Sequence, residues 1–392
     1  MPPMDSILLD LPGFKIIEVT GKTFLTLRVE FLEKAACPHC QSAKLRLKDT
    51  FTRRIRHIMF GQRPTWLEVR ANKYGCRACG KYFNTRFPGV RLRKRASEPC
   101  RVEISKLHHG GQTQRSLSQQ LRLGSATVER WYQNYFELRN REFMNAHCPR
   151  VIGIDEHFFT RKDGFATTIA NLSTHRVFDV VLGRSEASLK AYLRNLIGKE
   201  RVRVVVMDLS ETYRSIAKKH FSNALVVADR FHVVRLVNQQ FVKTWGDLDE
   251  KGRKHRGLVS LMRRHPDHFK PGQKEKLFKY LDEVPGLKPI YLFWQDLLRI
   301  LRMKGCNQQA CRNIIPEFLY IIEELRKANF QHLQKLGETL NSWKEEIARM
   351  FRFSKTNGIT EGLHNKMEML SRRAFGFRNF ENYRLRVRVL CG

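Results

Sequence analysis

The sequence predicts a multidomain α/β protein, and three observations along its 392 residues lead to this fold class. Residues 13–35 alternate between apolar and polar side chains, as short strands do. Residues 101–143 follow the helical period instead. From residue 151 strands and helices alternate, before a long helical and charged stretch at about 231–350. A chain of this length is expected to form two or three domains of ~100–200 residues each.

The charge balance predicts a polyanion as the partner. Lys and Arg number 72 against 38 Asp and Glu, which gives a formal charge of +34. An enzyme of small anions needs only a local basic pocket, whereas a nucleic acid releases counterions for each phosphate that is neutralised. The 42% apolar content excludes wholesale disorder. Without a membrane-length apolar run or the pattern of a signal peptide, the chain is expected to be soluble and intracellular.

Four of the nine cysteines predict a metal site in the first part of the chain. They form two Cys-x-x-Cys pairs separated by 35 residues: Cys37 with Cys40, and Cys76 with Cys79. In a reducing compartment such pairs bind metal more often than they form disulfides, and two tight turns would present four thiolates to one tetrahedral Zn²⁺. The alternatives are two redox pairs or ordinary core cysteines. We expect Gly80 to end the second turn, Phe83 to pack beneath it and His39 to be exposed.

The region around these cysteines is strongly basic. From Lys44 to Cys100 there are 16 Lys and Arg against only Asp49, Glu68 and Glu98. Because so few carboxylates are available to pair with them, contact with phosphates is favoured over a merely solvated basic face.

Residues 113–131 have the pattern of a helix-turn-helix. Ser116 and Gln119 fit a capping box for the first helix, Gly124 permits a sharp turn, and Ser125 can cap the second helix. Apolar side chains then face inward: Leu117, Leu121, Val128 and Trp131. Three polar side chains are left to reach a major groove: Thr127, Arg130 and Gln133. A plain helical hairpin is the alternative.

The order of elements from residue 151 is that of a ribonuclease-H-like fold. Three hairpin-like strands (151–154, 166–172 and 176–182) precede a helix, a strand at 202–207, a helix at 211–220 and a strand at 224–227. The helical segment that follows would be an insertion before the last helix, with interruptions near three prolines: Pro266, Pro285 and Pro316.

Two acids close neighbouring strands of this predicted sheet. Asp155 follows the strand 151–154, and Asp208 follows the strand 202–207, so their carboxylates should converge at one edge. Two close like charges are costly unless a divalent cation lies between them. An acid at a strand end is often only a cap, but the combination in this fold order favours a metal site.

The third acidic candidate is Glu361. It lies at the start of a predicted helix, after a turn at Asn357-Gly358. The core face of this helix would carry Leu363, Met367 and Leu370. Glu368, two turns further along, is a weaker candidate for the same role. By strand alternation, Glu156 should point away from Asp155.

Taken together, the motifs resemble the DDE transposases of bacterial insertion sequences, specifically the ISL-three family with an N-terminal zinc finger. The resemblance covers nearly the whole chain. It rests on the two cysteine pairs, with Gly80-Lys81-x-Phe83 after the second, and on five further strings: Ile154-Asp155-Glu156, Met207-Asp208-Leu209-Ser210, Ala228-Asp229-Arg230-Phe231-His232-Val233, Thr356-Asn357-Gly358-x-x-Glu361-Gly362-x-x-Asn365-Lys366, and Arg372-Arg373-Ala374-Phe375-Gly376-Phe377-Arg378-Asn379-Phe380.

The resemblance implies an acidic triad of Asp155, Asp208 and Glu361 that holds two Mg²⁺ ions. The enzyme would hydrolyse a phosphodiester bond and then join the freed 3′-OH to target DNA, in the cytoplasm of a bacterium and associated with its nucleoid. Double-stranded DNA, both element ends and target, would be the partner, and cutting two ends together implies a homodimer or a higher assembly. Catalytically inactive DNA-binding regulators and metal-dependent nucleases without strand transfer are the alternatives.

On this interpretation the chain has three parts. A zinc-binding module (1–95) and a helix-turn-helix (96–148) would recognise terminal inverted repeats, and the ribonuclease-H-like catalytic domain (149–392) would carry a helical insertion at about 244–340. Asp229 and His232 are either a helix cap and a packed core imidazole or groups near the scissile phosphate. Arg372 and Arg373 either guide the DNA backbone or form a solvated helix face.

Overall fold

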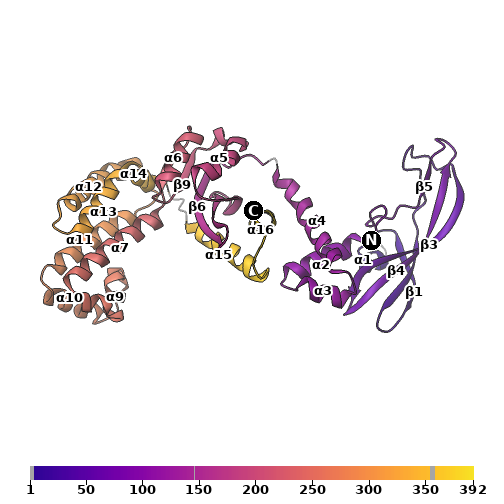
Figure 1. Ribbon diagram of the computed structural model, residues 1–392, viewed down its shortest axis with the longest axis horizontal. Coiled ribbons are helices and arrows are strands. Elements are labelled where there is room, and N and C mark those ends of the chain that lie inside the picture. Colours follow the sequence, from indigo (N-terminus) through magenta and orange to yellow (C-terminus); the bar gives the residue numbers. More distant parts are fainter. Residues whose placement is uncertain (1–3, 145, 354–357) are drawn as a thin grey trace. The chain divides into compact units, whose positions relative to one another are not determined.

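The structure is a computed structural model that describes residues 4–144, 146–353 and 358–392 (Figure 1). The chain forms two compact units. The first comprises Met1–Glu142 and Ser371–Gly376, and the second comprises Phe143–Leu370 and Phe377–Gly392.

The first unit combines a five-stranded sheet with helices. The sheet has the order β1-β2-β4-β3, with β5 paired to β4, and β2 and β4 are its parallel pair. In chain order its elements are α1 (Met4–Leu9), β1 (Phe14–Thr20), β2 (Leu25–Phe31), β3 (Leu45–Phe60), β4 (Arg63–Cys76), β5 (Tyr82–Asn84), α2 (Glu98–His109), α3 (Gln114–Leu121) and α4 (Ser125–Met144).

The alternation predicted for residues 13–35 is confirmed in β2, where Leu25, Leu27 and Val29 are buried while Arg28 is exposed. These side chains belong to a core that also includes Leu67 of β4. A separate small core joins α2, α3 and α4 and contains Cys100, Ile104, Leu117, Leu121 and Val128.

Two local predictions for α3 and α4 were wrong. The cap of α3 is Thr113, whose hydroxyl accepts from the Ser116 N–H, so Ser116 lies inside the helix. The left-handed residue of the turn is Arg122 (φ 49°), and its guanidinium lies over the Phe24 ring at 4.2 Å. Ser125 is the first residue of α4 rather than its cap.

The second unit contains the sheet predicted from residue 151 onward. Its strand order is β10-β9-β6-β7-β8, with β9 and β10 parallel to β6 and with β7 and β8 in an antiparallel hairpin. The bounds are β6 (Val151–Thr160), β7 (Gly164–Asn171), β8 (Arg176–Leu182), α5 (Glu186–Asn195), η1 (Lys199–Arg201), β9 (Val204–Met207), α6 (Glu211–His220) and β10 (Leu225–Ala228).

Strand β6 is longer than predicted. Its first four residues pair with β9, but Asp155 to Thr160 continue beside β7, so Asp155 lies within the strand and does not close it. The longer hairpin with β7 supplies the hydrogen-bond partners that keep the chain extended beyond Ile154.

A helical body follows β10 and gathers around α7 and α11 to α13 (Figure 1). Pro316 lies inside α12, so the predicted break there was wrong, although Pro266 and Pro285 do separate helices. Buried residues on both sides of Pro316, including Ile314 and Phe318, stabilise the helix across the lost N–H donor. The remaining elements are α7 (Arg230–Leu248), α8 (Glu250–Lys254), α9 (Arg256–Arg263), η2 (Pro266–His268), α10 (Gln273–Glu283), α11 (Leu287–Arg302), α12 (Gln308–Lys327), α13 (Gln331–Ser342), α14 (Lys344–Arg352), α15 (Gly358–Arg373) and α16 (Phe380–Cys391).

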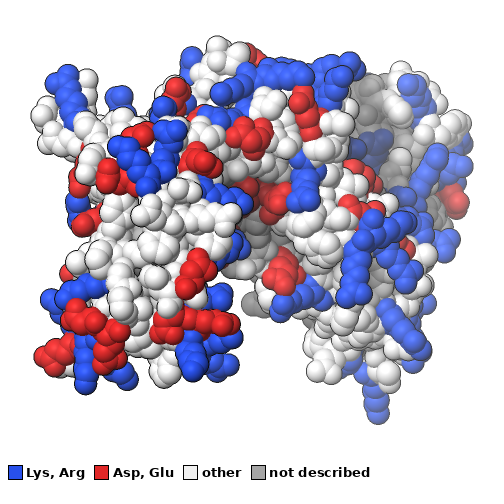
Figure 2. Space-filling view, turned by 60° about the vertical axis from the view of Figure 1, so that its left-hand side comes forward, with Lys and Arg blue, Asp and Glu red and all other residues white. Residues whose placement is uncertain are grey.

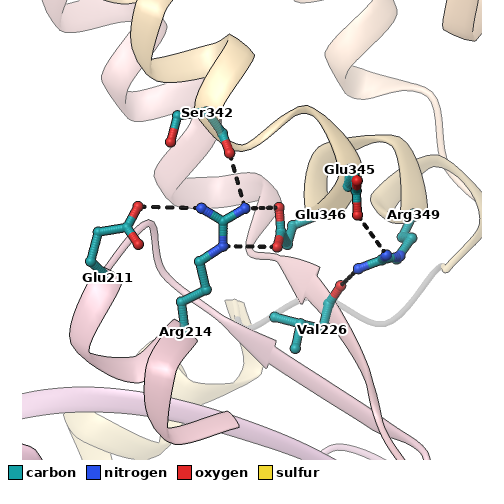
Figure 3. Close-up of polar contacts among 7 residues, drawn as sticks. All are labelled: Glu211, Arg214, Val226, Ser342, Glu345, Glu346 and Arg349. Carbon is teal, nitrogen blue, oxygen red and sulfur yellow. Dashed lines mark hydrogen bonds and ion pairs between the residues drawn. The ribbon is translucent and has the colours of Figure 1, made fainter. Parts of the chain in front are cut away.

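Arginines attach the helical body to the sheet. Arg214 of α6 makes two 2.9 Å hydrogen bonds to the buried Glu346 of α14 and a third to the Ser342 carbonyl (Figure 3). Arg349 of α14 donates to the Val226 carbonyl of β10 at 3.1 Å. The helices are therefore fixed to the elements that follow Asp208. None of the described helices is both long and apolar enough to cross a membrane.

Candidate metal centres and active site

The four cysteines come together as predicted. Their sulfur atoms all lie within 4.8 Å of one another, with Cys37 3.6 Å from Cys79 and Cys40 3.5 Å from Cys76. This spacing fits the edges of a tetrahedron of thiolates around one zinc ion.

Two equivalent backbone turns build this cluster. In each, the first cysteine N–H donates to the carbonyl five residues later, and the N–H four residues later donates back to the cysteine carbonyl: Cys37 to Ser42 and Gln41 to Cys37, Cys76 to Lys81 and Gly80 to Cys76. Gln41 (φ 59°) and Gly80 (φ 73°) are both left-handed at the matching position. The two pairs are therefore two copies of one turn, facing each other.

Two predictions for the surroundings are confirmed, since Gly80 ends the second turn and His39 is exposed. The Phe83 ring contacts the Tyr74 ring at 5.7 Å. The sulfur cluster lies at one end of the β3–β4 hairpin, and two of its cysteines, Cys37 and Cys76, are buried.

The second cluster consists of the acidic residues Asp155 and Asp208 and lies where β6 and β9 run side by side. Ile154 pairs with Met207, so the residues that follow them, Asp155 and Asp208, lie next to each other. The Asp155 side chain is only 13% exposed, and its Oδ1 accepts from the Glu156 N–H at 2.9 Å. The Oδ1 of Asp208 is buried and has no hydrogen-bond partner among the described residues.

Burial and mutual repulsion make these carboxylates hard to ionise. Burial, with smaller contributions from the charges of Asp208 and Asp229, raises the pKa of Asp155 to about 7. The pKa of Asp208 is raised to about 6, first by burial. Two ionised carboxylates here would repel each other with little solvent to screen them. A carboxylate oxygen without a hydrogen-bond partner is a fitting ligand for a hard divalent cation. The residues present therefore fit Mg²⁺.

Asp229 and His232 lie beside this pair. Asp229 is 1% exposed and occupies the cap position of α7, but its side chain makes no capping hydrogen bond. His232 Nε2 lies 3.7 Å from the Asp229 Oδ2, and the charges of both residues act on Asp155 and Asp208. Asp229 is therefore the cap residue of α7 by position, as predicted, but without a capping hydrogen bond from its side chain, and His232, at 27% side-chain exposure, is not a fully packed core group.

The structure does not bring Glu361 into the acidic cluster. It lies in the first turn of α15 and is exposed, as is Glu368. Among the described residues, the four cysteines form the only group of three or more Cys, His, Asp or Glu whose ligand atoms lie within 4.8 Å. The predicted core face is confirmed, since Leu363, Met367 and Leu370 are buried. The predicted turn at Asn357 falls outside the described residues.

Glu156 lies on the face of β6 opposite to Asp155. Glu156 pairs with Arg184 at 3.2 Å and stands across from Thr167, whose hydroxyl contacts Tyr213 of α6. Asp155 instead stands across from Thr168. The alternation expected along the strand is therefore present.

Sequence reasoning missed the polar side chains that accompany Asp155. His364 Nδ1 lies 3.9 Å from the Asp155 Oδ2. From His364, successive hydrogen bonds lead through Thr168 and His157 to Tyr383. Burial lowers the pKa of His364 to about 4 and, with His364 as neighbour, that of His157 to about 3, so both imidazoles are neutral at pH 7. The sequence did contain a signal for His157. It follows Asp155 by two residues, so in a strand both side chains point to the same face.

The predicted DNA-contacting side chains lie on α4 and α15. Arg130 is exposed, whereas Thr127 and Gln133 are half-buried, and the Gln133 amide donates to Glu129 at 3.3 Å. Arg372 and Arg373 are exposed in the last turn of α15.

Comparison with known proteins gives matches over most of the chain. Residues 152–387 match a family described as transposase, of the ISL-three type, and residues 33–79 match the zinc-finger of transposases IS204, IS1001, IS1096 and IS1165. A transposase for insertion sequence element IS1001 from Bordetella parapertussis is 21% identical, over 90% of this chain and 88% of that protein.

Two further relatives cover less of the chain. A transposase for IS1557 from Mycobacterium tuberculosis is 21% identical over 59% of this chain and 57% of that protein. A protein named ATP-dependent protease from Lactococcus lactis is 30% identical over 90 residues, which are 20% of this chain and 29% of that protein.

Proposed function

The chain belongs to the ISL-three family of transposases with an N-terminal zinc ribbon, and from this premise we propose that it binds the terminal inverted repeats of an insertion sequence and catalyses metal-dependent DNA cleavage and strand transfer. The observation that carries the proposal is the pair of buried carboxylates at the level where β6 and β9 meet, with one orphaned oxygen.

Strand order supports a ribonuclease-H-like catalytic domain. Numbered from β6, the order is 3-2-1-4-5, with the first three strands antiparallel and the last two parallel to the first. Asp155 on strand 1 and Asp208 after strand 4 then stand at the centre of the sheet, where neighbouring strands deliver side chains to one edge. Residues at about 244–340 of the helical body are the proposed insertion, and residues 149–392 are the proposed domain.

Asp155, Asp208 and Glu361 are the proposed ligands of two Mg²⁺ ions. When bound, Mg²⁺ would activate water or a 3′-OH as nucleophile and stabilise the charge on the leaving 3′ oxygen. Asp155 and Asp208 would remain ionised because the cation offsets the burial that now raises their pKa values. Asp229 and His232, beside them, are proposed to face the scissile phosphate.

Zinc and the basic surface would serve DNA recognition. The zinc-finger match and the sulfur cluster together support one structural zinc ion, held by Cys37, Cys40, Cys76 and Cys79. Helices α3 and α4 are the proposed helix-turn-helix, with Thr127, Arg130 and Gln133 toward the groove, and Arg372 and Arg373 are proposed to contact the backbone. Lys and Arg side chains spread over much of the face in Figure 2, while acidic ones lie in small groups. That distribution suits a partner whose phosphates form a continuous charged surface. We also propose a homodimer or higher assembly on DNA, in the bacterial cytoplasm and on its nucleoid.

A catalytically inactive DNA-binding regulator is the second candidate, favoured by the exposed position of Glu361 outside the acidic cluster. Incubation of the purified chain with Mg²⁺ and labelled element ends separates the candidates. Joined products are expected. Products that are cut but not joined would indicate a nuclease, and DNA that is bound but uncut would indicate the regulator.

A further inference from the structure

Four side chains form a continuous hydrogen-bonded chain that ends beside Asp155. It starts at Tyr383 of α16, passes through His157 and Thr168, and reaches His364 of α15. The separations are 2.9 Å from the Tyr383 hydroxyl to His157 Nε2, 3.0 Å from His157 Nδ1 to Thr168 Oγ1, 3.0 Å from Thr168 Oγ1 to His364 Nε2, and 3.9 Å from His364 Nδ1 to Asp155 Oδ2.

The sheet places these groups together. Thr168 is the cross-strand partner of Asp155, and His157 lies two residues further along β6, so all three share one face. Helices α15 and α16 supply His364 and Tyr383 to that face. Thr168 is fully buried and the others are largely so, which keeps water from replacing the protein contacts.

The single proton of the Thr168 hydroxyl gives the chain a direction. The hydroxyl can donate to one imidazole and must accept from the other. The ring that accepts from Thr168 carries its N–H on its other nitrogen, and the ring that donates to Thr168 carries it on the facing nitrogen, so two arrangements satisfy every contact. In the first, the Tyr383 hydroxyl donates to His157, His157 donates to Thr168, Thr168 donates to His364, and the His364 Nδ1–H faces Asp155. In the second, every donor is reversed and a nitrogen lone pair faces Asp155.

With a cation bound, the Asp155 carboxylate is ionised, and its charge selects the first arrangement because an anion attracts an N–H and repels a lone pair. We propose that His364 is a positioning residue that presents its Nδ1–H to Asp155, with its tautomer held by Thr168, His157 and Tyr383. At 3.9 Å the contact is electrostatic rather than a hydrogen bond.

This arrangement orients a metal ligand. Asp155 Oδ1 accepts from the Glu156 N–H, and Oδ2 faces His364, so each oxygen has a defined direction and the remaining lone pairs are left for the cation. Groups that orient ligating carboxylates in this way contribute about tenfold or more to metal affinity. The inference rests on the proposed function, because it assumes that Asp155 binds metal.

The tautomers are one test. Long-range ¹H–¹⁵N spectra of the histidine-labelled full chain with Mg²⁺ should show His157 and His364 both protonated on Nδ1, assigned by their loss in His157→Gln and His364→Gln. Protonation of His364 on Nε2 would overturn the proposal.

Metal affinity is the second test, and it needs no catalysis. Mn²⁺ binding to the zinc-loaded full chain, measured by electron paramagnetic resonance, should weaken about tenfold in His364→Ala and several-fold in Thr168→Val. His364→Gln should largely retain affinity, because its amide can accept from Thr168 and donate to Asp155. Thr167→Val, on the same strand but the opposite face, and Tyr280→Phe, which loses its hydroxyl contacts with Trp245 and Asp249 in the helical body, are the controls and should bind normally.

Folding is monitored by thermal melts, so that a variant that fails to fold is replaced by Tyr383→Phe, which removes one hydroxyl. Unchanged Mn²⁺ affinity in folded His364→Ala and Thr168→Val would overturn the inference while leaving the active site in place. If Asp155→Asn and Asp208→Asn also bind Mn²⁺ normally, the proposed metal site itself is wrong.

Discussion

The two candidate metal centres of this chain are built in opposite ways. The cysteine cluster comes from two short turns, each of which fixes its own pair of sulfurs through local backbone hydrogen bonds. The acidic cluster comes from the ends and middles of separate elements, and only Asp155 and Asp208 are set side by side by strand pairing. Local geometry therefore completes the first site, whereas the second depends on the packing of the whole unit around it.

The largest expected effect comes from breaking the first site. Cys76→Ser removes one thiolate, so the chain should retain less than one zinc ion and the first unit should lose a stabilisation on the order of 10 kcal/mol that structural zinc provides. Metal analysis and melting of the full chain measure both. Cys311→Ser, a half-buried cysteine outside the cluster, is the matched control and should keep its zinc. Full zinc content in Cys76→Ser would contradict the assignment.

Breaking the second site should affect chemistry and not folding. Asp208→Asn keeps the shape of the side chain but removes the charge that a cation needs, so cleavage of labelled element ends should fall by about a thousandfold, with DNA binding retained. Asp282→Asn, at an exposed surface pair with Lys288, is the control and should cleave normally. Retained cleavage in Asp208→Asn would place the active site elsewhere.

The second site depends on packing by residues far along the chain, and this dependence can be tested at the contact between Arg214 and Glu346. Glu346 is 1% exposed and accepts two hydrogen bonds from Arg214, whose side chain is 18% exposed. Glu346→Ala therefore leaves a largely buried guanidinium with only the Ser342 carbonyl and the exposed Glu211 as polar partners among the described residues. The free energy of unfolding should fall by about 3 kcal/mol. The neighbouring Glu345→Ala, an exposed pair with Arg349 (Figure 3), should change it by less than about 1 kcal/mol.

Denaturant unfolding measures both variants. Equal, small losses would mean that the helical body is held to the sheet by apolar packing alone. A selective loss in Glu346→Ala would show that the elements beside Asp208 are stabilised by a residue 138 positions further along the chain.

What the sequence predicted follows the same division between local and distant causes. The cysteine site, the order of strands and helices along the chain from β6 to β10 and the core face of α15 were predictable, since each depends on short-range spacing or period. The length of β6 was not, because the extension beyond Ile154 depends on pairing with β7. Nor was the His364 contact, since the spacing of residues along α15 does not say which side chain from another strand will meet it.

The turn at α3 shows the same limit on a small scale. Gly124 was expected to permit the sharp turn, yet the left-handed residue is Arg122, whose guanidinium lies over the ring of Phe24 between β1 and β2. Arg122 therefore adopts a left-handed conformation that glycine would adopt more easily, while its side chain contacts a ring from another part of the unit.

The smallest expected effect concerns the two cysteine turns, which differ at one matching position. Gly80 adopts φ 73° with open space where a Cβ would stand, so Gly80→Ala adds only backbone strain and should lower stability by about 1 kcal/mol. Gln41 already bears that strain at φ 59°, and Gln41→Gly relieves it while raising the entropy of the unfolded chain, so its net effect should be close to zero. Melting of the zinc-loaded chain compares the two. A loss in Gln41→Gly as large as that in Gly80→Ala would mean that the Gln41 side chain, rather than its backbone, stabilises the first turn.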